Sequence, residues 1–228
     1  MRRSPYALRR LCAGRPLAGA AGLAALALFA PAARAQTGGG LAVGVGAFTI
    51  SGESRASLSP RAGLGARLWL EREVRAGLSV GAGVEYLAKG ADGEAPADVL
   101  FPEDGPNETL VRLRFDHAYL EVPVYLAYAP TVRARVQPQV YAGPHVSFLQ
   151  SAYARYGARG AALGEAQTDA SIRSRDFGLT AGALVRAEAG AFGRLVVGAH
   201  ASLGFQNLRR RTPALTARGV LVYAGVSF

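Results

Sequence analysis

An alternation of apolar with small or polar residues, with a period of two, is the feature that most limits what this chain can fold into. In residues 76–89 every second position is apolar: Leu78, Val80, Ala82, Val84, Tyr86 and Ala88. Glycine, serine and charged residues fill most of the positions between them: Gly77, Ser79, Gly81, Gly83, Glu85 and Lys89. Successive side chains of a strand point to opposite faces, so the pattern predicts a strand with one apolar and one polar face.

The same alternation recurs along the chain, in residues 41–50, 62–71, 118–128, 136–148, 177–188, 195–206 and 217–228. A soluble sandwich or a lipocalin-like barrel would turn its apolar face inward and carry Lys and Glu outside. Here the polar face carries mainly Gly, Ser, Gln and Tyr. Long strands divided in this way are typical of transmembrane barrels. We therefore expect an all-β fold, an eight-stranded antiparallel transmembrane β-barrel with the topology of an up-and-down meander.

The connections between these segments alternate in length. Those after the second, fourth and sixth strands are short: 71–75, 130–134 and 190–193. Those after the first, third, fifth and seventh strands are longer: 51–61, 90–111, 150–174 and 207–216. Outer-membrane barrels have short periplasmic turns and long external loops. The alternation therefore predicts a barrel with both termini in the periplasm.

The first 35 residues differ from the rest and predict a cleaved signal peptide. Arginines crowd the beginning of the chain, before an apolar run over about 17–30. Ala33-Arg34-Ala35 then has the small-x-small pattern that signal peptidase reads, so we expect cleavage before Gln36. A transmembrane anchor is the alternative, but the run is short for about 30 Å of hydrocarbon. The expected domains are a signal peptide, 1–35, and an outer-membrane β-barrel, 36–228.

Removal of the signal peptide changes the charge of the chain. The full sequence has 26 Lys and Arg against 16 Asp and Glu, which gives a formal net charge of +10. Residues 1–35 hold six of those arginines and no acidic residue, so the remaining chain carries +4. This excess is too small to indicate nucleic-acid binding. The only cysteine, Cys12, also leaves, which excludes disulfides, cysteine nucleophiles and thiolate metal sites from the mature chain.

Short motifs spread over 41–228 carry a resemblance to a known family. They are Lys89-Gly90, Leu120-Glu121-Val122-Pro123, Tyr141-Ala142-Gly143-Pro144, Asp176-Phe177-Gly178 with Ala181-Gly182, Gly204-Phe205-Gln206-Asn207 and the terminal Phe228. In order and spacing they resemble the PorT-like family of outer-membrane β-barrels, also described as the outer membrane protein β-barrel domain. The resemblance implies an outer-membrane barrel and, by analogy alone, a role in protein secretion.

Polar residues on the inward faces are the candidate site. We expect a polar network in the lumen that includes Arg67, Glu85, Glu121, Arg186, Glu188, Tyr141 and His200. Eight strands enclose a space that side chains fill, and charges buried there need partners. A narrow polar pore or a ligand pocket is the alternative.

The histidines do not predict a metal site. His117, His145 and His200 lie on three separate inward faces, with no paired spacing and no acidic partner at ligand spacing. Histidines bonded to their neighbours in the lumen are the expectation. No catalytic, metal-binding or cofactor-binding residue is therefore predicted.

Two further features bear on partners. Arginines gather near the predicted outer rim, at Arg112 and Arg114, at Arg173 and Arg175, and at Arg209, Arg210 and Arg211. Arginine forks suit phosphate oxygens, so Arg209–Arg211 are predicted to contact lipopolysaccharide, with solvated loop bases as the alternative. The last strand ends on an aromatic residue, Phe228, which resembles the signal read by the machinery that assembles outer-membrane barrels.

The sequence thus predicts a small outer-membrane barrel with a structural or cell-surface binding role. We expect it to be a monomer in lipid, with no enzymatic activity, no cofactor and no nucleic-acid partner. A narrow porin-like channel and a PorT-like factor that assists protein secretion remain as alternatives.

Overall fold

The computed structural model describes residues 37–52, 57–97, 109–130, 135–158, 161–168, 172–190, 193–206 and 215–228. All of them belong to one compact unit, Ala35–Phe228. The predicted signal peptide and Arg209–Arg211 lie outside the described residues. In the described ranges, no helix is long and apolar enough to cross a membrane.

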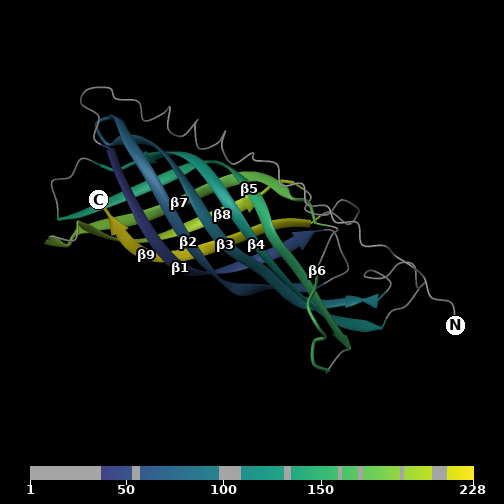
Figure 1. Ribbon diagram of the computed structural model, residues 1–228. Coiled ribbons are helices and arrows are strands. Elements are labelled where there is room, and N and C mark those ends of the chain that lie inside the picture. Colours follow the sequence, from purple (N-terminus) through teal and green to yellow (C-terminus); the bar gives the residue numbers. More distant parts are fainter. Residues whose placement is uncertain are drawn as a thin grey trace. The chain divides into compact units, whose positions relative to one another are not determined.

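The described residues form nine strands: β1 (Thr37–Gly52), β2 (Ser57–Arg75), β3 (Leu78–Pro96), β4 (Leu110–Tyr128), β5 (Val136–Ala158), β6 (Gln167–Thr168), β7 (Arg175–Glu188), β8 (Arg194–Gly204) and β9 (Leu215–Ser227). Eight of them form an antiparallel ring in chain order, which β9 closes by pairing with β1 (Figure 1). The remaining strand, β6, pairs only with Tyr153 and Ala154 of β5. The predicted eight-stranded meander is confirmed, and β6 is an addition that the alternation did not indicate.

Strands on one side of the barrel are longer than those on the other. β2, β3 and β4 have 19 residues each and β5 has 23, whereas β8 has 11 and β9 has 13. β3 continues to Pro96 and β4 begins at Leu110, so both strands run into the long loop expected over 90–111. Short connections join the strands at the end of the barrel where β1 begins and β9 ends, and we call this the inner end. The additional residues therefore lie at the opposite, outer end (Figure 1).

The short turn expected at 71–75 is wrong. These residues continue β2, whose inward face carries the buried Glu71, and the turn to β3 is formed by Ala76 and Gly77. Gly77 has a φ of 76°, a backbone conformation that glycine adopts without steric cost. The carboxylate of Glu73 accepts a hydrogen bond from the amide of Gly77 at 3.0 Å. Charged residues at the end of β2 therefore belong to the strand and to its turn, and do not mark a loop.

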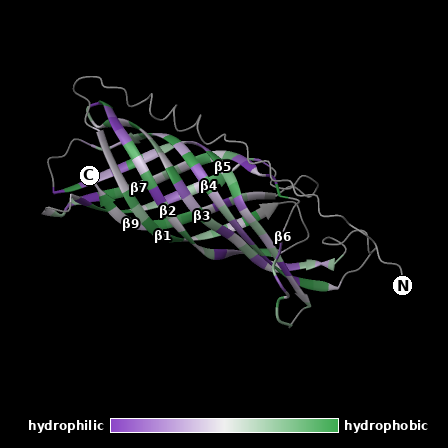
Figure 2. Ribbon diagram, viewed as in Figure 1, coloured by the Kyte–Doolittle hydropathy of each residue, from purple (hydrophilic) through white to green (hydrophobic). Residues whose placement is uncertain are grey.

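Apolar side chains face outward and polar side chains face inward, the reverse of a soluble protein. Apolar and hydrophilic residues alternate along the strands (Figure 2). Val43, Leu64 and Val222 are 64%, 66% and 55% exposed, whereas Glu85 and Glu121 are 1% exposed. Strands present this outward face all around the ring. A continuous apolar surface of this kind matches hydrocarbon, and ring closure leaves no strand edge to satisfy there.

Three inward-facing glycines make room for three large tyrosines. A Cβ atom added to Gly81 would collide with the ring of Tyr125, one added to Gly182 with Tyr141, and one added to Gly198 with Tyr223. Each tyrosine is buried and comes from another strand than its glycine. The abundance of glycine on the inward faces thus follows from the packing of aromatic rings in a narrow lumen.

Pro123 lies inside β4, where the sequence offered no reason for its presence. The register of β3 with β4 passes from Ala82–Val124 to Glu85–Glu121, without paired positions at Gly83 and Val84. Proline has no amide hydrogen to donate to a neighbouring strand. The interrupted ladder is therefore the local adjustment that accommodates Pro123 within the wall of the barrel.

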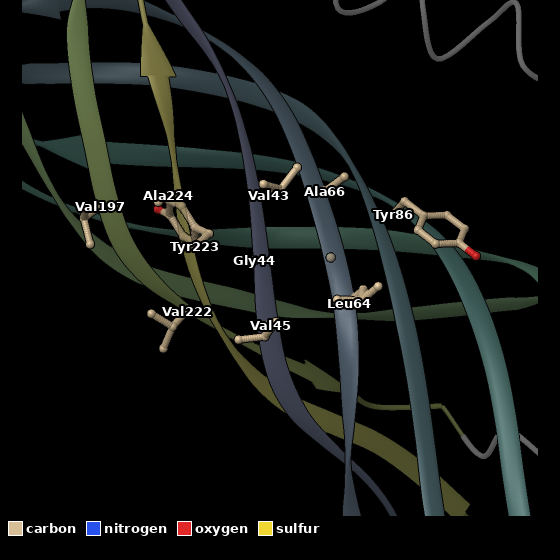
Figure 3. Close-up of a pocket in the computed structure, with 11 residues that line it drawn as sticks. Val43, Gly44, Val45, Leu64, Ala66, Tyr86, Val197, Val222, Tyr223 and Ala224 are labelled. Carbon is tan, nitrogen blue, oxygen red and sulfur yellow. The ribbon is translucent and has the colours of Figure 1, made fainter. Parts of the chain in front are cut away.

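The outward face is hollowed on one side, over β9, β1, β2 and β3 (Figure 3). This hollow has a volume of about 680 Å³ and is lined by Val43, Gly44, Val45, Leu64, Gly65, Ala66, Tyr86, Val197, Val222, Tyr223 and Ala224. Glycine and alanine form much of its floor, and larger apolar side chains stand around them. We call it the outer hollow.

Outward-facing valines provide a test of the membrane orientation. Val222, in the middle of β9, and Val74, at the inner end of β2, are 55% and 57% exposed. Replacing Val222 with Arg is expected to cost about 2–4 kcal/mol of unfolding free energy, and replacing Val74 with Arg about 0–1 kcal/mol, because the cost of a charge depends on its depth in the bilayer. Urea unfolding in lipid vesicles measures both values. Equal effects of the two substitutions would contradict a spanning barrel.

Candidate functional site

The lumen brings together most of the residues that the sequence placed there. Arg67, Glu85, Glu121, Tyr141 and His200 are buried, and the side chain of Arg186 is 13% exposed. Glu188 was predicted to belong to the same network, and this part of the prediction is wrong. It is the last residue of β7, opposite Arg194 of β8, and its side chain is exposed at the mouth of the barrel.

Arg67 occupies the centre of the lumen. Its guanidinium donates hydrogen bonds to the hydroxyls of Tyr141 and Tyr223 and forms an ion pair with Glu85, with 3.1 Å between Nε and Oε1. Aromatic rings surround the same group: its Cζ lies 4.3 Å from the ring centroid of Tyr141 and 5.4 Å from that of Trp69. Arginine is suited to this place because its planar cation both stacks on rings and donates several hydrogen bonds.

A second cation lies further toward the outer end of the barrel. Nζ of Lys89 is 2.6 Å from Oε1 of Glu121 and 3.0 Å from Oγ of Ser202. The hydroxyl of Ser147 donates to the same carboxylate oxygen at 2.8 Å, and Nε2 of His145 is 3.8 Å away from it. Strands β3, β4, β5 and β8 therefore meet through the contacts of Glu121 and Lys89.

The imidazole ring of His200 contacts Glu85 and Tyr141, both of which also bind Arg67. Its Nε2 is 3.2 Å from Oε2 of Glu85, and its Nδ1 is 3.1 Å from the hydroxyl of Tyr141. Thr180 also contacts the ring, with its hydroxyl oxygen 3.1 Å from Nδ1. His200 is 1% exposed, so its ring is held by these contacts and not by solvent.

A third group of polar contacts is centred on Glu71, nearer the inner end. Its carboxylate accepts hydrogen bonds from Arg186 at 2.7 Å, from Gln139 at 3.0 Å and from Tyr125 at 3.2 Å. The donors come from β7, β5 and β4. Glu71 was missed because the sequence placed a turn there, although it continues the inward series of Arg67 and Trp69.

The outer part of the lumen is apolar. Ile50, Ala91, Leu113, Phe115 and Ala154 are between 0% and 5% exposed and form one cluster, with Leu58 and Tyr156 packed against it. Strands β1, β3, β4, β5 and β9 contribute side chains to this cluster. Side chains therefore fill the lumen at four successive levels, three of them polar and one apolar.

Glu85, Glu121 and His200 are close enough to be considered as metal ligands. One ligand atom from each lies within 4.8 Å of the others, so the fold brings His200 close to two acidic residues of other strands, which no spacing in the sequence indicated. Arg67 and Lys89 already neutralise the two carboxylates. A divalent ion would bring two more positive charges beside two buried cations. The arrangement fits an internal ion-pair network better than a metal site.

Comparison with known proteins agrees with this architecture. A family model described as "Outer membrane protein beta-barrel domain" matches residues 29–210. No curated protein matches the chain.

Several solved structures are similar to this chain at low sequence identity. Neisserial surface protein A is 12% identical, with 86% of this chain and 98% of that chain covered and a TM-score of 0.47. A major outer membrane protein from Thermus thermophilus is 16% identical, with 83% and 99% covered and a TM-score of 0.44. Ail, the attachment invasion locus protein of Yersinia pestis, is 12% identical, with 85% and 99% covered and a TM-score of 0.42.

Substitution of Lys89 tests the ion-pair network. In Lys89→Met, the carboxylate of Glu121 remains buried without its cation, and the expected loss is about 3–5 kcal/mol of unfolding free energy. The double variant Lys89→Met/Glu121→Gln removes the unpaired charge and should recover part of that loss. Arg114→Met is the control, because Arg114 pairs with Asp92 where both side chains are partly exposed, and about 0–1 kcal/mol is expected. Equal losses for the buried and the exposed pair would contradict the network.

Proposed function

Because the chain belongs to the family of outer membrane protein β-barrel domains, we propose that it is a closed barrel of the bacterial outer membrane with a structural or cell-surface binding role and without catalysis. The observation that carries this proposal is the combination of an apolar outward face with a lumen filled by paired charges and aromatic rings. Such a lumen stabilises the wall and leaves the outer ends of the strands as the part that meets other molecules.

The absence of catalysis is supported by how the polar residues of the lumen are used. Glu85, Glu121 and His200 are each about 1% exposed; Glu85 contacts Arg67 and His200, and Glu121 contacts Lys89. A general acid or base must come within hydrogen-bond reach of a substrate. A substrate would have to displace the packed side chains to reach these groups.

Export and assembly complete the proposal. The arginine-rich start, the apolar run and Ala33-Arg34-Ala35 support a signal peptide over 1–35. We propose that the assembly machinery of the outer membrane recognises the last strand through Phe228 and that the barrel functions as a monomer in lipid. Arg209–Arg211 remain proposed contacts for lipopolysaccharide.

The motifs at Leu120–Pro123 and Tyr141–Pro144 support a narrower placement in the PorT-like family. A role in secretion is an analogy from that family and rests on no contact in this chain. A deletion strain with normal protein secretion would argue against such a role.

A narrow channel is the competing function, and one observation favours it. Polar groups follow one another along the lumen from Glu71 through Arg67 to Lys89. We expect no conductance from the wild-type protein in planar bilayers, because these groups bind each other and aromatic rings fill the space between them. Discrete single-channel steps from a preparation whose band shifts on boiling, and which is therefore folded, would favour the channel over the closed barrel.

The proposed assembly signal also has a direct test. Phe228 is 77% exposed, and its backbone exchanges two hydrogen bonds of 2.9 Å with Gly39. A Phe228→Ser variant keeps these backbone bonds and should remain foldable in detergent, yet its amount in the outer membrane should fall severalfold. Phe205→Ser, an outward-facing aromatic that is 62% exposed at the end of β8, is the matched control. Equal outer-membrane levels of Phe228→Ser and wild type would remove the proposed signal.

A further inference from the structure

The outward face of β2–β5 changes from apolar to charged at one level. Tyr86 of β3 is paired with Leu120 of β4, which is paired with Phe148 of β5, so this row is apolar. Further out, Asp92 is paired with Arg114, and Arg114 is paired with Arg155. These two rows lie six residues apart on β3, or about 15 Å along the axis of a tilted barrel. The charged row therefore lies where the hydrocarbon ends and lipid headgroups begin.

Arginines at this level have more donors than the neighbouring carboxylates use. Asp116 is shared by Arg61, which forms an ion pair with it, and by Arg155, whose Nε is 3.9 Å from Oδ2. Nε of Arg155 is buried and has no hydrogen-bond partner among the described residues. Arg114 uses two of its nitrogens on Asp92, at 2.7 and 3.3 Å. A third acidic residue, Glu94, lies opposite Arg112 in the next row of the strand register.

Small residues leave space beside these guanidinium groups. Gly90 belongs to β3, which lies between β2 and β4, and it is paired with Asp116 of β4. The side chain of Arg61 passes over Gly90 to reach Asp116. A Cβ atom added to Gly90 would lie 3.4 Å from Cδ of Arg61 and 2.5 Å from the carbonyl oxygen of Phe115. Ala88 of β3 and Ala118 of β4, one row below, are paired and equally small. The barrel surface beneath the arginine side chains is therefore formed by small residues.

The outer hollow lies on the same side of the barrel and closer to the membrane centre. Leu64 and Ala66 of β2 and Tyr86 of β3 line its edge next to the charged level. These same two strands carry Arg61 and Asp92 further out. An amphipathic molecule with acyl chains and a phosphate could thus meet an apolar surface and guanidinium groups along one path.

We propose that this face of the barrel binds a phosphorylated glycolipid of the outer leaflet, with its phosphate held by Arg61 and Arg155 and its acyl chains in the outer hollow. The proposal rests on the proposed location in the outer membrane. Phosphate accepts charge-assisted hydrogen bonds from guanidinium groups. Among the described residues Arg155 forms only the 3.9 Å ion pair with Asp116, and its side chain is 43% exposed. A soluble anion would explain the arginines but not the hollow below them.

The test measures binding of lipid A to the protein purified from outer membranes in detergent, by native mass spectrometry. Bis-phosphorylated lipid A and its dephosphorylated form are the two probes, and inorganic phosphate is the competitor. The double variant Arg61→Gln/Arg155→Gln should bind bis-phosphorylated lipid A about tenfold more weakly or worse, since it loses charge-assisted hydrogen bonds. The control Arg135→Gln/Arg194→Gln changes two exposed arginines at the inner end and should bind like wild type.

Each outcome supports or overturns the proposal. Preference of the wild type for the phosphorylated lipid, lost only in the Arg61/Arg155 variant, supports it. Equal binding of both lipid forms, or equal losses in both double variants, overturns it. Displacement of lipid A by an equal concentration of inorganic phosphate would show a site for free anions and overturn the lipid as occupant. All variants are first checked for outer-membrane fractionation and a band that shifts on boiling; failure of the wild type there contradicts the proposed function itself.

Discussion

Pairing of β9 with β1 closes the wall, and this closure sets the conditions for every other part of the barrel. A ring of eight strands has a fixed and narrow interior, so the side chains that enter it must fit one another in volume as well as in charge. Glycine and tyrosine therefore occur in complementary places, as Gly182 and Tyr141 do. The same closure satisfies the backbone without water, which permits the outward face to be apolar where it meets hydrocarbon.

Charge in the lumen is arranged in pairs of a carboxylate and a cation. Glu71, Glu85 and Glu121 each contact a different cation, Arg186, Arg67 and Lys89 respectively. Removal of one partner from such a pair is more costly than replacement of both. Arg67–Glu85 and Lys89–Glu121 join neighbouring strands, whereas Glu71–Arg186 joins β2 to β7 on the opposite wall. Hydrogen bonds from Arg67 to Tyr141 of β5 and from Lys89 to Ser202 of β8 also cross the lumen. A wall of hydrogen-bonded strands alone could still flatten, and these contacts across the lumen oppose that change.

Much of the fold follows from the alternation of residues, because the two faces of each strand meet such different surroundings. The order and number of the strands in the ring, and the burial of Arg67, Glu85 and Glu121, could be predicted in this way. The ends of the strands could not be predicted, because the sequence does not distinguish a glutamate in the lumen, such as Glu71, from one at the mouth, such as Glu188. The partners of each lumen residue depend on the register between strands and on the tilt of the barrel. For that reason the approach of His200 to Glu85 and the role of Lys89 needed the structure.

The unequal lengths of the strands give the barrel a slanted outer rim. β5 is 12 residues longer than β8, since the two have 23 and 11 residues. At about 3.3 Å per residue and with the tilt of barrel strands, this difference raises one side of the rim by roughly 30 Å. A neighbouring cell or a large soluble molecule that approaches along the membrane normal meets the ends of β3, β4 and β5 first. Among the described residues, contact with such a molecule then falls first to these strands.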